Sequence, residues 1–142
     1  MKYAIFSLTA DPKKPFNQPV KKAIVPYVDF SPLYNALANL KVTIDTLEGK
    51  SLISLVSKDA LNDKLMHAEQ VLTFVSGLPR RSWYRHQIYA PGFYTGYGVK
   101  TLPGVREAIE QENWEECQSQ VTILATTLQN FDAHLQSILV LN

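Results

Sequence analysis

Three stretches of the chain repeat hydrophobic residues with helical spacing. In the first, the apolar positions are Leu33, Leu37, Leu40, Ile44 and Leu47. The second has the same offsets and contains Leu61, Leu65, Ala68, Leu72 and Val75. The third is longer and contains Trp114, Cys117, Val121, Leu124, Leu128, Phe131, Leu135 and Ile138. Because residues three and four apart share one face of a helix, each stretch predicts an amphipathic helix.

Residues that favour helix ends flank the first two stretches. Ser31 suits the N-cap position, and Pro32 suits the first helical position. Gly49 is a plausible C-terminal stop. The second stretch is expected to stop at residues 77–79, which read Gly-Leu-Pro. These signals place two helices before the middle of the chain.

The third helix is expected to start at Asn113, with Glu116 three residues later as in a capping box. Residues 103–111 predict one short helix that has a proline in its first turn. Residues 51–56 (SLISLV) stay ambiguous, since they suit a continuation of the first helix, the start of the second or, less well, a short strand.

Amphipathic helices can bury their apolar faces only against each other. We therefore predict an all-α fold, an up-and-down four-helix-type bundle in which a long crossover loop rich in Gly, Pro and aromatic residues joins the second and last helices. Residues 31–142 form this helical domain. Residues 1–30 form a connector, because five prolines between positions 12 and 32 exclude a continuous helix. The same stripes would also serve an oligomer interface, although core packing alone explains most such stripes.

Composition adds limits to this picture. The chain has 142 residues, a formal charge of +1 and 46% hydrophobic residues, which suits one globular domain. Near neutrality gives no general attraction to nucleic acid or membrane. One cysteine excludes an internal disulfide. No apolar run approaches the roughly 20 residues of a membrane-spanning helix.

Charge is unevenly distributed along the chain. Residues 70–106 contain no Asp or Glu but carry five cations, so this stretch is +5 and the rest is −4. The cations are Arg80, Arg81, Arg85, Lys100 and Arg106, and the aromatic residues between them are Trp83, Tyr84, Tyr89, Phe93, Tyr94 and Tyr97. Such a loop suits anion binding. A purely structural interpretation is that the aromatics plug the end of the bundle and the arginines pair with Glu107, Glu110 or Glu112. RNA binding by stacking is a further alternative, weakened by the acidic remainder of the chain.

The sequence contains no self-contained catalytic constellation. Cys117 and His134 lie 17 residues apart on one predicted helix, about 25 Å along its axis, so they do not meet. Cys117 also lies within the apolar stripe and is expected to be buried. His67, His86 and His134 lack the short spacing of metal ligands, so no metal site is predicted in this chain.

One long motif is specific. Residues 78–110, LPRRSWYRHQIYAPGFYTGYGVKTLPGVREAIE, resemble the transferrin-receptor-like dimerisation domain of the glutamate carboxypeptidase (prostate-specific membrane antigen) group of zinc peptidases. The residues that fit the family pattern are Leu78, Pro79, Arg81, Trp83, Tyr84, Arg85, His86, Ile88, Tyr89, Ala90, Pro91, Tyr97, Leu102, Pro103 and Gly104. The resemblance covers about residues 30–142. A weaker similarity over residues 8–16 suggests that the chain follows a peptidase domain in a longer protein, of which residues 1–30 would hold the tail.

The resemblance implies a division of labour. An upstream α/β domain would carry zinc and the catalytic residues, so this chain alone is not expected to hydrolyse peptides. The helical domain would pair with its twin, and its loop over residues 78–106 would help to line the substrate pocket of the parent enzyme. The expected partners are thus a second copy and the upstream peptidase domain, with no nucleic acid and no membrane segment in this chain.

At one position of the loop the sequence departs from the pattern of the glutamate-specific members of this family. In glutamate-specific members, a Lys-Tyr pair in the loop grips the carboxylates of the substrate's glutamate. The matching positions here are Gly96 and Tyr97. Tyr97 can still hydrogen-bond an α-carboxylate, but the partner of the side-chain carboxylate is missing at Gly96, and Lys100 lies four residues further along. The transferrin receptor keeps the fold without catalysis, so a non-catalytic receptor-like module that binds a protein partner is the alternative. Family members are often secreted or membrane-anchored, and the sequence leaves the compartment undetermined.

Overall fold

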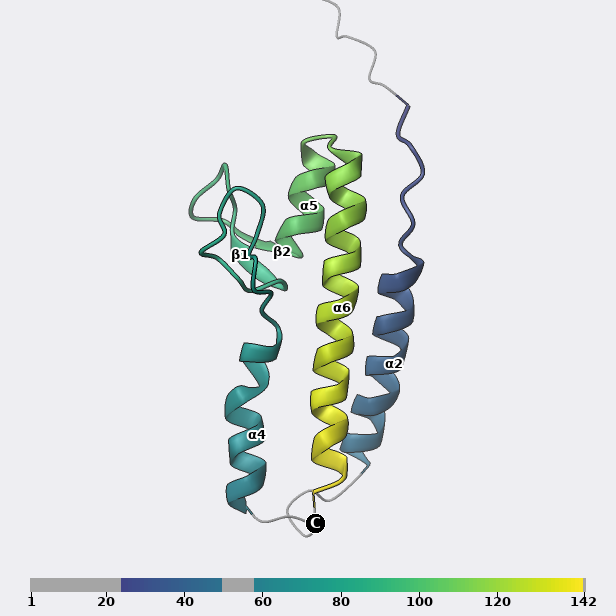
Figure 1. The fold of residues 1–142 in the computed structure, drawn as a ribbon, viewed down its shortest axis with the longest axis vertical. Coiled ribbons are helices and arrows are strands. Elements are labelled where there is room, and N and C mark those ends of the chain that lie inside the picture. The colour runs from purple at the N-terminus through teal and green to yellow at the C-terminus, as the bar shows by residue number, and fades with distance from the viewer. Residues whose placement is uncertain (1–23, 50–57, 142) are drawn as a thin grey trace, which may run out of the picture.

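The computed structural model describes residues 24–49 and 58–141, and this part of the chain is mainly helical (Figure 1). Its elements are α2 (Ser31–Glu48), α4 (Lys58–Val71), α5 (Pro103–Glu110) and α6 (Trp114–Leu139), with the short strands β1 (Tyr89–Pro91) and β2 (Val99–Thr101). Helix α6 lies centrally and packs against α2, α4 and α5. The helical class is confirmed, whereas a closed four-helix bundle is not confirmed in the described part. The predictions for residues 51–56 and for the first 23 residues lie outside it.

Helix α2 buries a face slightly different from the predicted one. Leu33 and Leu40 are buried as expected, together with Ala36 and Thr43. Two other predicted core positions fall outside this face, since Leu37 is 45% and Ile44 is 37% exposed, whereas Leu47 is half-buried. Small residues at the contact let two helices approach closely, which explains why Ala36 rather than Leu37 faces the core.

The first turn of α2 differs from the prediction in its cap. Phe30 is the N-cap and makes no side-chain cap hydrogen bond, and Ser31 is the first helical residue. The Ser31 N–H donates instead to Asp29 Oδ1 over 2.9 Å, so an aspartate two residues earlier takes the capping role. Gln118 of α6 binds both the N–H and the C=O of Asp29, which fixes the start of α2 on α6. Gly49 is the C-cap, as predicted.

Helix α4 ends earlier than the apolar pattern predicted. It stops at Val71, whereas Val75 is 75% exposed beyond its end. The backbone after the helix bonds to a different segment, because the Phe74 N–H donates to the Arg85 carbonyl and the Leu72 carbonyl accepts from the Gln87 N–H. No residue of α4 is fully buried. Among the described helices that pack on α6, α4 is therefore the least tightly packed.

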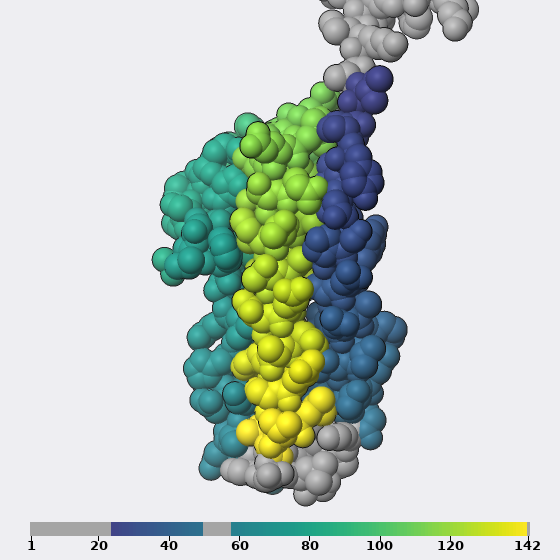
Figure 2. Space-filling view, turned by 45° about the vertical axis from the view of Figure 1, so that its right-hand side comes forward, coloured from purple at the N-terminus to yellow at the C-terminus, as the bar shows by residue number. Residues whose placement is uncertain are grey.

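The core lies along α6, where the predicted stripe is confirmed. Cys117 and Val121 are fully buried against Val105 and Ala108 of α5. Burial raises the pKa of the Cys117 thiol, as expected for a packing residue rather than a nucleophile. Figure 2 shows α6 running along the surface with the chain on both sides of it. Among the described residues, no helix is both long and apolar enough to cross a membrane.

The predicted cap of α6 is half confirmed. Asn113 is the N-cap, and its side chain accepts the Glu116 N–H over 3.2 Å. The reciprocal half of a capping box is absent here, because both Glu116 carboxylate oxygens bind Arg80 at 2.8 Å. The acidic side chain of the first turn therefore ties α6 to the loop.

Candidate functional site

The loop between α4 and α5 contains a hairpin that stands beside α5 (Figure 1). Strands β1 and β2 pair antiparallel, with Ala90 opposite Lys100. Beyond them, residues 92–98 form what we call the tip. The Gly92 N–H donates to the Gly98 carbonyl over 2.8 Å, and the Gly96 N–H donates to the Gly92 carbonyl over 2.9 Å. The sequence predicted the long loop but not this hairpin.

A compact turn precedes the hairpin. The Leu78 N–H donates to the Tyr84 carbonyl, and the Tyr84 N–H donates to the Arg81 carbonyl. Leu78 is only 2% exposed and fixes this turn on the body of the domain. Within the motif, Trp83 and Arg85 instead point their side chains to solvent.

The turn places Arg81 in a buried ion pair with Glu107 of α5. Arg81 Nη2 lies 2.8 Å from each oxygen of the Glu107 carboxylate, and both side chains are almost fully buried. Arg81 Nη1 donates to the carbonyl of Pro91, and Glu107 Oε1 accepts the Phe93 N–H over 2.9 Å. The guanidinium also lies 6.0 Å from the centre of the Tyr84 ring. Three segments of the chain therefore meet at this pair.

Most other cations of the loop also have acidic partners. Arg80 binds Glu116 in a two-pronged ion pair, and Glu116 raises the pKa of Arg80. Lys100 and Arg106 both bind Glu110. These contacts lower the pKa of Glu110, with the Lys100 hydrogen bond as the largest cause. The purely structural interpretation of the arginines is confirmed for Arg81 with Glu107 and for Arg106 with Glu110, whereas the partner of Arg80, Glu116, was not foreseen.

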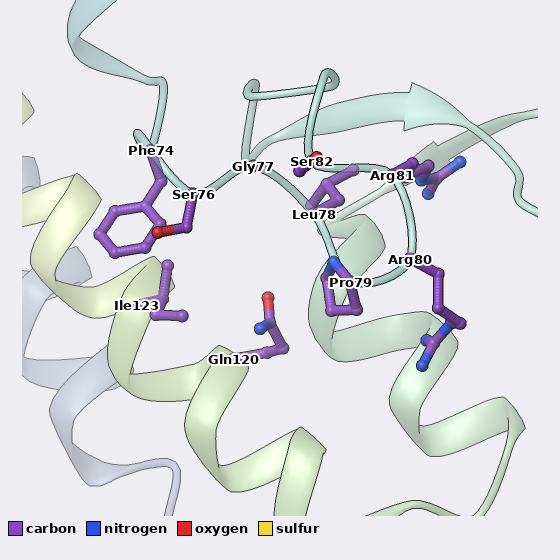
Figure 3. A pocket seen from close by; sticks show the side chains of 10 residues that line it. All are labelled: Phe74, Ser76, Gly77, Leu78, Pro79, Arg80, Arg81, Ser82, Gln120 and Ile123. Carbon is purple, nitrogen blue, oxygen red and sulfur yellow. The ribbon is translucent and has the colours of Figure 1, made fainter.

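A surface pocket of about 390 Å³ lies between the turn and α6 (Figure 3). Its lining residues are Phe74, Ser76, Gly77, Leu78, Pro79, Arg80, Arg81, Ser82, Gln120 and Ile123. In Figure 3, the Arg80 and Arg81 side chains run away from Gln120 and Ile123. Because both guanidinium groups bind carboxylates, this pocket lacks the free positive charge that an anion site needs.

His86 and Tyr89 form a second contact, with the end of α4. His86 Nε2 lies 2.9 Å from Glu69 Oε2, while its Nδ1 accepts the N–H groups of Ile88 and Tyr89 at 3.3 Å. The Tyr89 hydroxyl donates to the same Glu69 oxygen over 3.4 Å. The charge of Glu69 is the largest cause of the raised pKa of Tyr89. Glu69 was missed in the sequence because it lies on a different predicted element, 17 residues before His86.

The aromatic side chains of the loop do not plug the end of the bundle. Trp83 is 78%, Tyr94 is 70% and Tyr97 is fully exposed. That prediction is wrong because hydrogen bonds hold the hairpin out beside α5, with its tip facing solvent. Gly96 has φ of +65°, and no atom lies within 4 Å of where its Cβ would be. Tyr97 and Gly96 are thus displayed on the tip.

Lys100, the third predicted substrate contact, is differently placed. It lies on β2 rather than in the tip, and its side chain is largely buried against Glu110 and near Gly92. Pro103 and Gly104 open α5, as the motif predicted, and both are buried. A Cβ on Gly104 would lie 2.2 Å from Gln120 Oε1, so α5 and α6 approach closely here. The hairpin is therefore supported on a tightly packed helix.

The described residues contain no group of three or more His, Cys, Asp or Glu placed to hold a metal. Each histidine has another partner. His67 Nδ1 lies 2.7 Å from the Asp63 carbonyl, and His134 Nε2 lies 2.9 Å from the Lys64 carbonyl. Cys117 and His134 are not brought together.

Comparisons with known proteins agree with the long motif. The family model of the transferrin receptor-like dimerisation domain matches residues 28–136. A probable glutamate carboxypeptidase LAMP1 of Arabidopsis thaliana is 32% identical over 122 residues, which cover 80% of this chain and 18% of the plant protein. A probable glutamate carboxypeptidase of Arthroderma benhamiae is 55% identical over 42 residues, 28% of this chain and 6% of the fungal protein. The chain thus spans less than a fifth of the length of these relatives.

Proposed function

The chain belongs to the transferrin receptor-like dimerisation domain family, and from this premise we propose that it pairs two copies of a glutamate carboxypeptidase-like protein and contributes its 78–106 loop to the substrate pocket. The relatives named above are much longer than the matched region, so the catalytic residues would lie elsewhere in the parent protein. This chain would be non-catalytic by itself.

Helix α2 offers the face that we propose for pairing. Besides its buried face, it carries a second row of apolar side chains, Tyr34, Leu37 and Ile44, that are 69%, 45% and 37% exposed. An interface around a two-fold axis brings the same row of both copies together. Lys41 falls in this row between Leu37 and Ile44 and is paired with Asp45 of its own helix. We therefore assign a second copy of this chain as the occupant of the row. A four-helix-type arrangement would then be completed by pairing.

Sedimentation equilibrium of this chain tests the pairing face. We expect a dimer for the unchanged chain and a monomer for Leu37→Glu/Ile44→Glu, since like charges would meet across the axis. Val42→Glu is the matched control, because Val42 is 66% exposed but lies roughly 140–160° around the helix from Leu37 and Ile44, the two substituted positions. A double variant that still dimerises as tightly as the control would refute this face. An unchanged chain that stays monomeric at high concentration would refute autonomous pairing.

The observation that supports pocket lining is the full exposure of Tyr97 on a tip whose base is fixed. A phenol hydroxyl held in this way is suited to donate to a carboxylate of a bound peptide. The absence of a cation at Gly96 favours a substrate whose last residue has a neutral side chain. Lys100 is not expected to compensate, because Glu110 already binds it.

Kinetics of the full-length protein test this role. Tyr97→Phe removes the hydroxyl and is expected to lower kcat/KM by roughly 10- to 100-fold, the effect of one lost charge-assisted hydrogen bond. Tyr94→Phe is the control on the same tip, where we expect less than a twofold change. Equal effects of the two variants would refute the assignment of Tyr97.

Zinc is expected in the peptidase domain of the parent, and the described residues of this chain offer no ligand set for it. The helical domain would therefore contribute to substrate binding and pairing rather than to cleavage of the peptide bond. A full-length protein that pairs but does not hydrolyse peptides when zinc is supplied would favour the alternative, a receptor-like module that binds a protein partner.

A further inference from the structure

The buried ion pair between Arg81 and Glu107 joins parts of the loop that are distant in sequence. Arg81 belongs to the turn before the hairpin, and Glu107 belongs to α5 after it. The side chains are 7% and 3% exposed, and one guanidinium nitrogen lies 2.8 Å from both carboxylate oxygens. The two elements that bracket the hairpin are thus held together by a buried ion pair.

The same pair also holds the backbone at the base of the tip. Arg81 donates to the carbonyl of Pro91, the last residue of β1, and Glu107 accepts the N–H of Phe93. These two bonds flank Gly92, where the chain leaves the strand. The Arg81 guanidinium also lies 5.7 Å from the centre of the Phe93 ring. Backbone and side chain of the first tip residues are therefore held at once.

The rest of the tip is bonded mainly to itself. Its backbone bonds run between Gly92 and Gly98, between Gly96 and Gly92, and between Tyr97 and Thr95. Such bonds shape the tip but do not orient it relative to α5. Orientation needs bonds to another element, and Glu107 supplies one to Phe93.

We propose that Arg81 and Glu107 are positioning residues that set the orientation of the 92–98 tip, and with it the direction in which Tyr97 points. The effect on substrate binding rests on the proposed function, whereas the orientation of the tip does not. Stability alone is a weaker explanation of the pair, because a buried ion pair often adds no more stability than apolar side chains of similar volume. Apolar side chains would, however, leave Pro91 and Phe93 without these two bonds.

This difference defines the test variant in the full-length protein. Arg81→Met/Glu107→Leu removes both charges together, so no buried charge is left without a partner. We expect the variant to fold and to pair, while the amide hydrogens of residues 92–98 exchange at least tenfold faster. KM should rise about tenfold with kcat nearly unchanged, because a misdirected Tyr97 weakens the ground state and the transition state alike.

Arg80→Met/Glu116→Leu is the matched control, since Arg80 also lies 5.7 Å from the centre of the Phe93 ring but, among the described residues, its side-chain hydrogen bonds go to Glu116 and not to the hairpin backbone. In this control variant, the amide hydrogen exchange rates of residues 92–98 should stay within twofold of those in the unchanged protein. Arg81→Lys is the second variant, for the case in which the double variant does not fold. It keeps the charge but loses the fork that reaches Glu107 and Pro91 together.

The outcomes separate the two proposals. If the tip exchanges at the unchanged rate in the variants that fold, the positioning role is overturned, whatever the kinetics. If exchange accelerates but KM does not change, Arg81 and Glu107 do orient the tip, and the pocket-lining function is overturned. Faster exchange together with a higher KM supports both.

Discussion

Substituting Gly104 by alanine tests how tightly α5, which supports the hairpin, is packed on α6. The new Cβ would lie 2.2 Å from Oε1, 3.0 Å from Cδ and 3.3 Å from Cγ of Gln120. Gln120 is only 8% exposed, so its amide has little room to move unless α5 shifts. Because Glu107 lies on α5, a shift of this helix would also disturb the base of the tip.

The expected loss of stability is the difference between two opposing effects of the added methyl group. Overpacking of a well-filled site costs about 1–3 kcal/mol. The better helix propensity of alanine offsets up to about 1 kcal/mol of this. We therefore expect Gly104→Ala to lower the free energy of unfolding by about 1–2 kcal/mol, which corresponds to a fall in Tm of roughly 3–7 °C for a chain of this size.

Urea denaturation followed by circular dichroism measures this change. Gly98→Ala is the control, because its Cβ would meet Thr95 Oγ1 at an ordinary 3.4 Å, and a loss below about 0.5 kcal/mol is expected. Adding Gln120→Ala to Gly104→Ala removes the colliding side chain. The double variant should lose at least about 1 kcal/mol less than the sum of the single variants. Additive losses, or equal losses at positions 98 and 104, would refute the close approach.

Three further predictions concern the tip, the hairpin and the core. Gly96→Lys in the full-length protein should shift kcat/KM about 10- to 100-fold toward peptides that end in glutamate. Gly96→Ala is the control, because it has the same left-handed backbone strain of about 1 kcal/mol but adds no cation, and its selectivity should not change. Equal selectivity of the two variants would refute the role of this position. The lowered pKa of Glu110 means that its stabilising effect is present above its ordinary value of 4.5 and is lost as the pH falls through the lowered value. The difference in urea midpoint between the unchanged chain and Lys100→Met should therefore shrink as the pH falls below 4.5 and through the lowered pKa of Glu110, and a constant difference would contradict the ion pair. Cys117 should react with a thiol reagent at neutral pH only after unfolding, and rapid reaction of the folded chain would contradict its burial.

The sequence was most informative where one physical effect dominated. The start of α6 was predicted because a long apolar stripe coincides with the Asn113 cap. The face of α2 was partly mispredicted, because periodicity cannot tell whether a helix contact needs Leu37 or the smaller Ala36. The end of α4 was missed because backbone partners at Arg85 and Gln87 compete with the helix, and such long-range partners leave no local signal.

The candidate site shows the same limit. The motif identified the loop, but strands of three residues are too short to give a periodic pattern, so the hairpin was not predicted. Glu107 was one of three acidic candidates for the arginines, and only the three-dimensional structure selects it for Arg81. Exposure of Tyr97 depends on the direction of the hairpin, which long-range bonds determine.

The arrangement of the elements separates the two proposed roles. The hairpin and α2 lie on opposite sides of α6 in Figure 1, so a second copy on α2 and a peptidase domain at the tip would not compete for one surface. Variants of Leu37 and Ile44 should therefore change pairing and leave the exchange of the tip unchanged, while variants of Arg81 and Glu107 should do the reverse. If pairing were needed to order the tip, the α2 variants would also accelerate its exchange. That result would join the two functions through α6, the helix that contacts both α2 and α5.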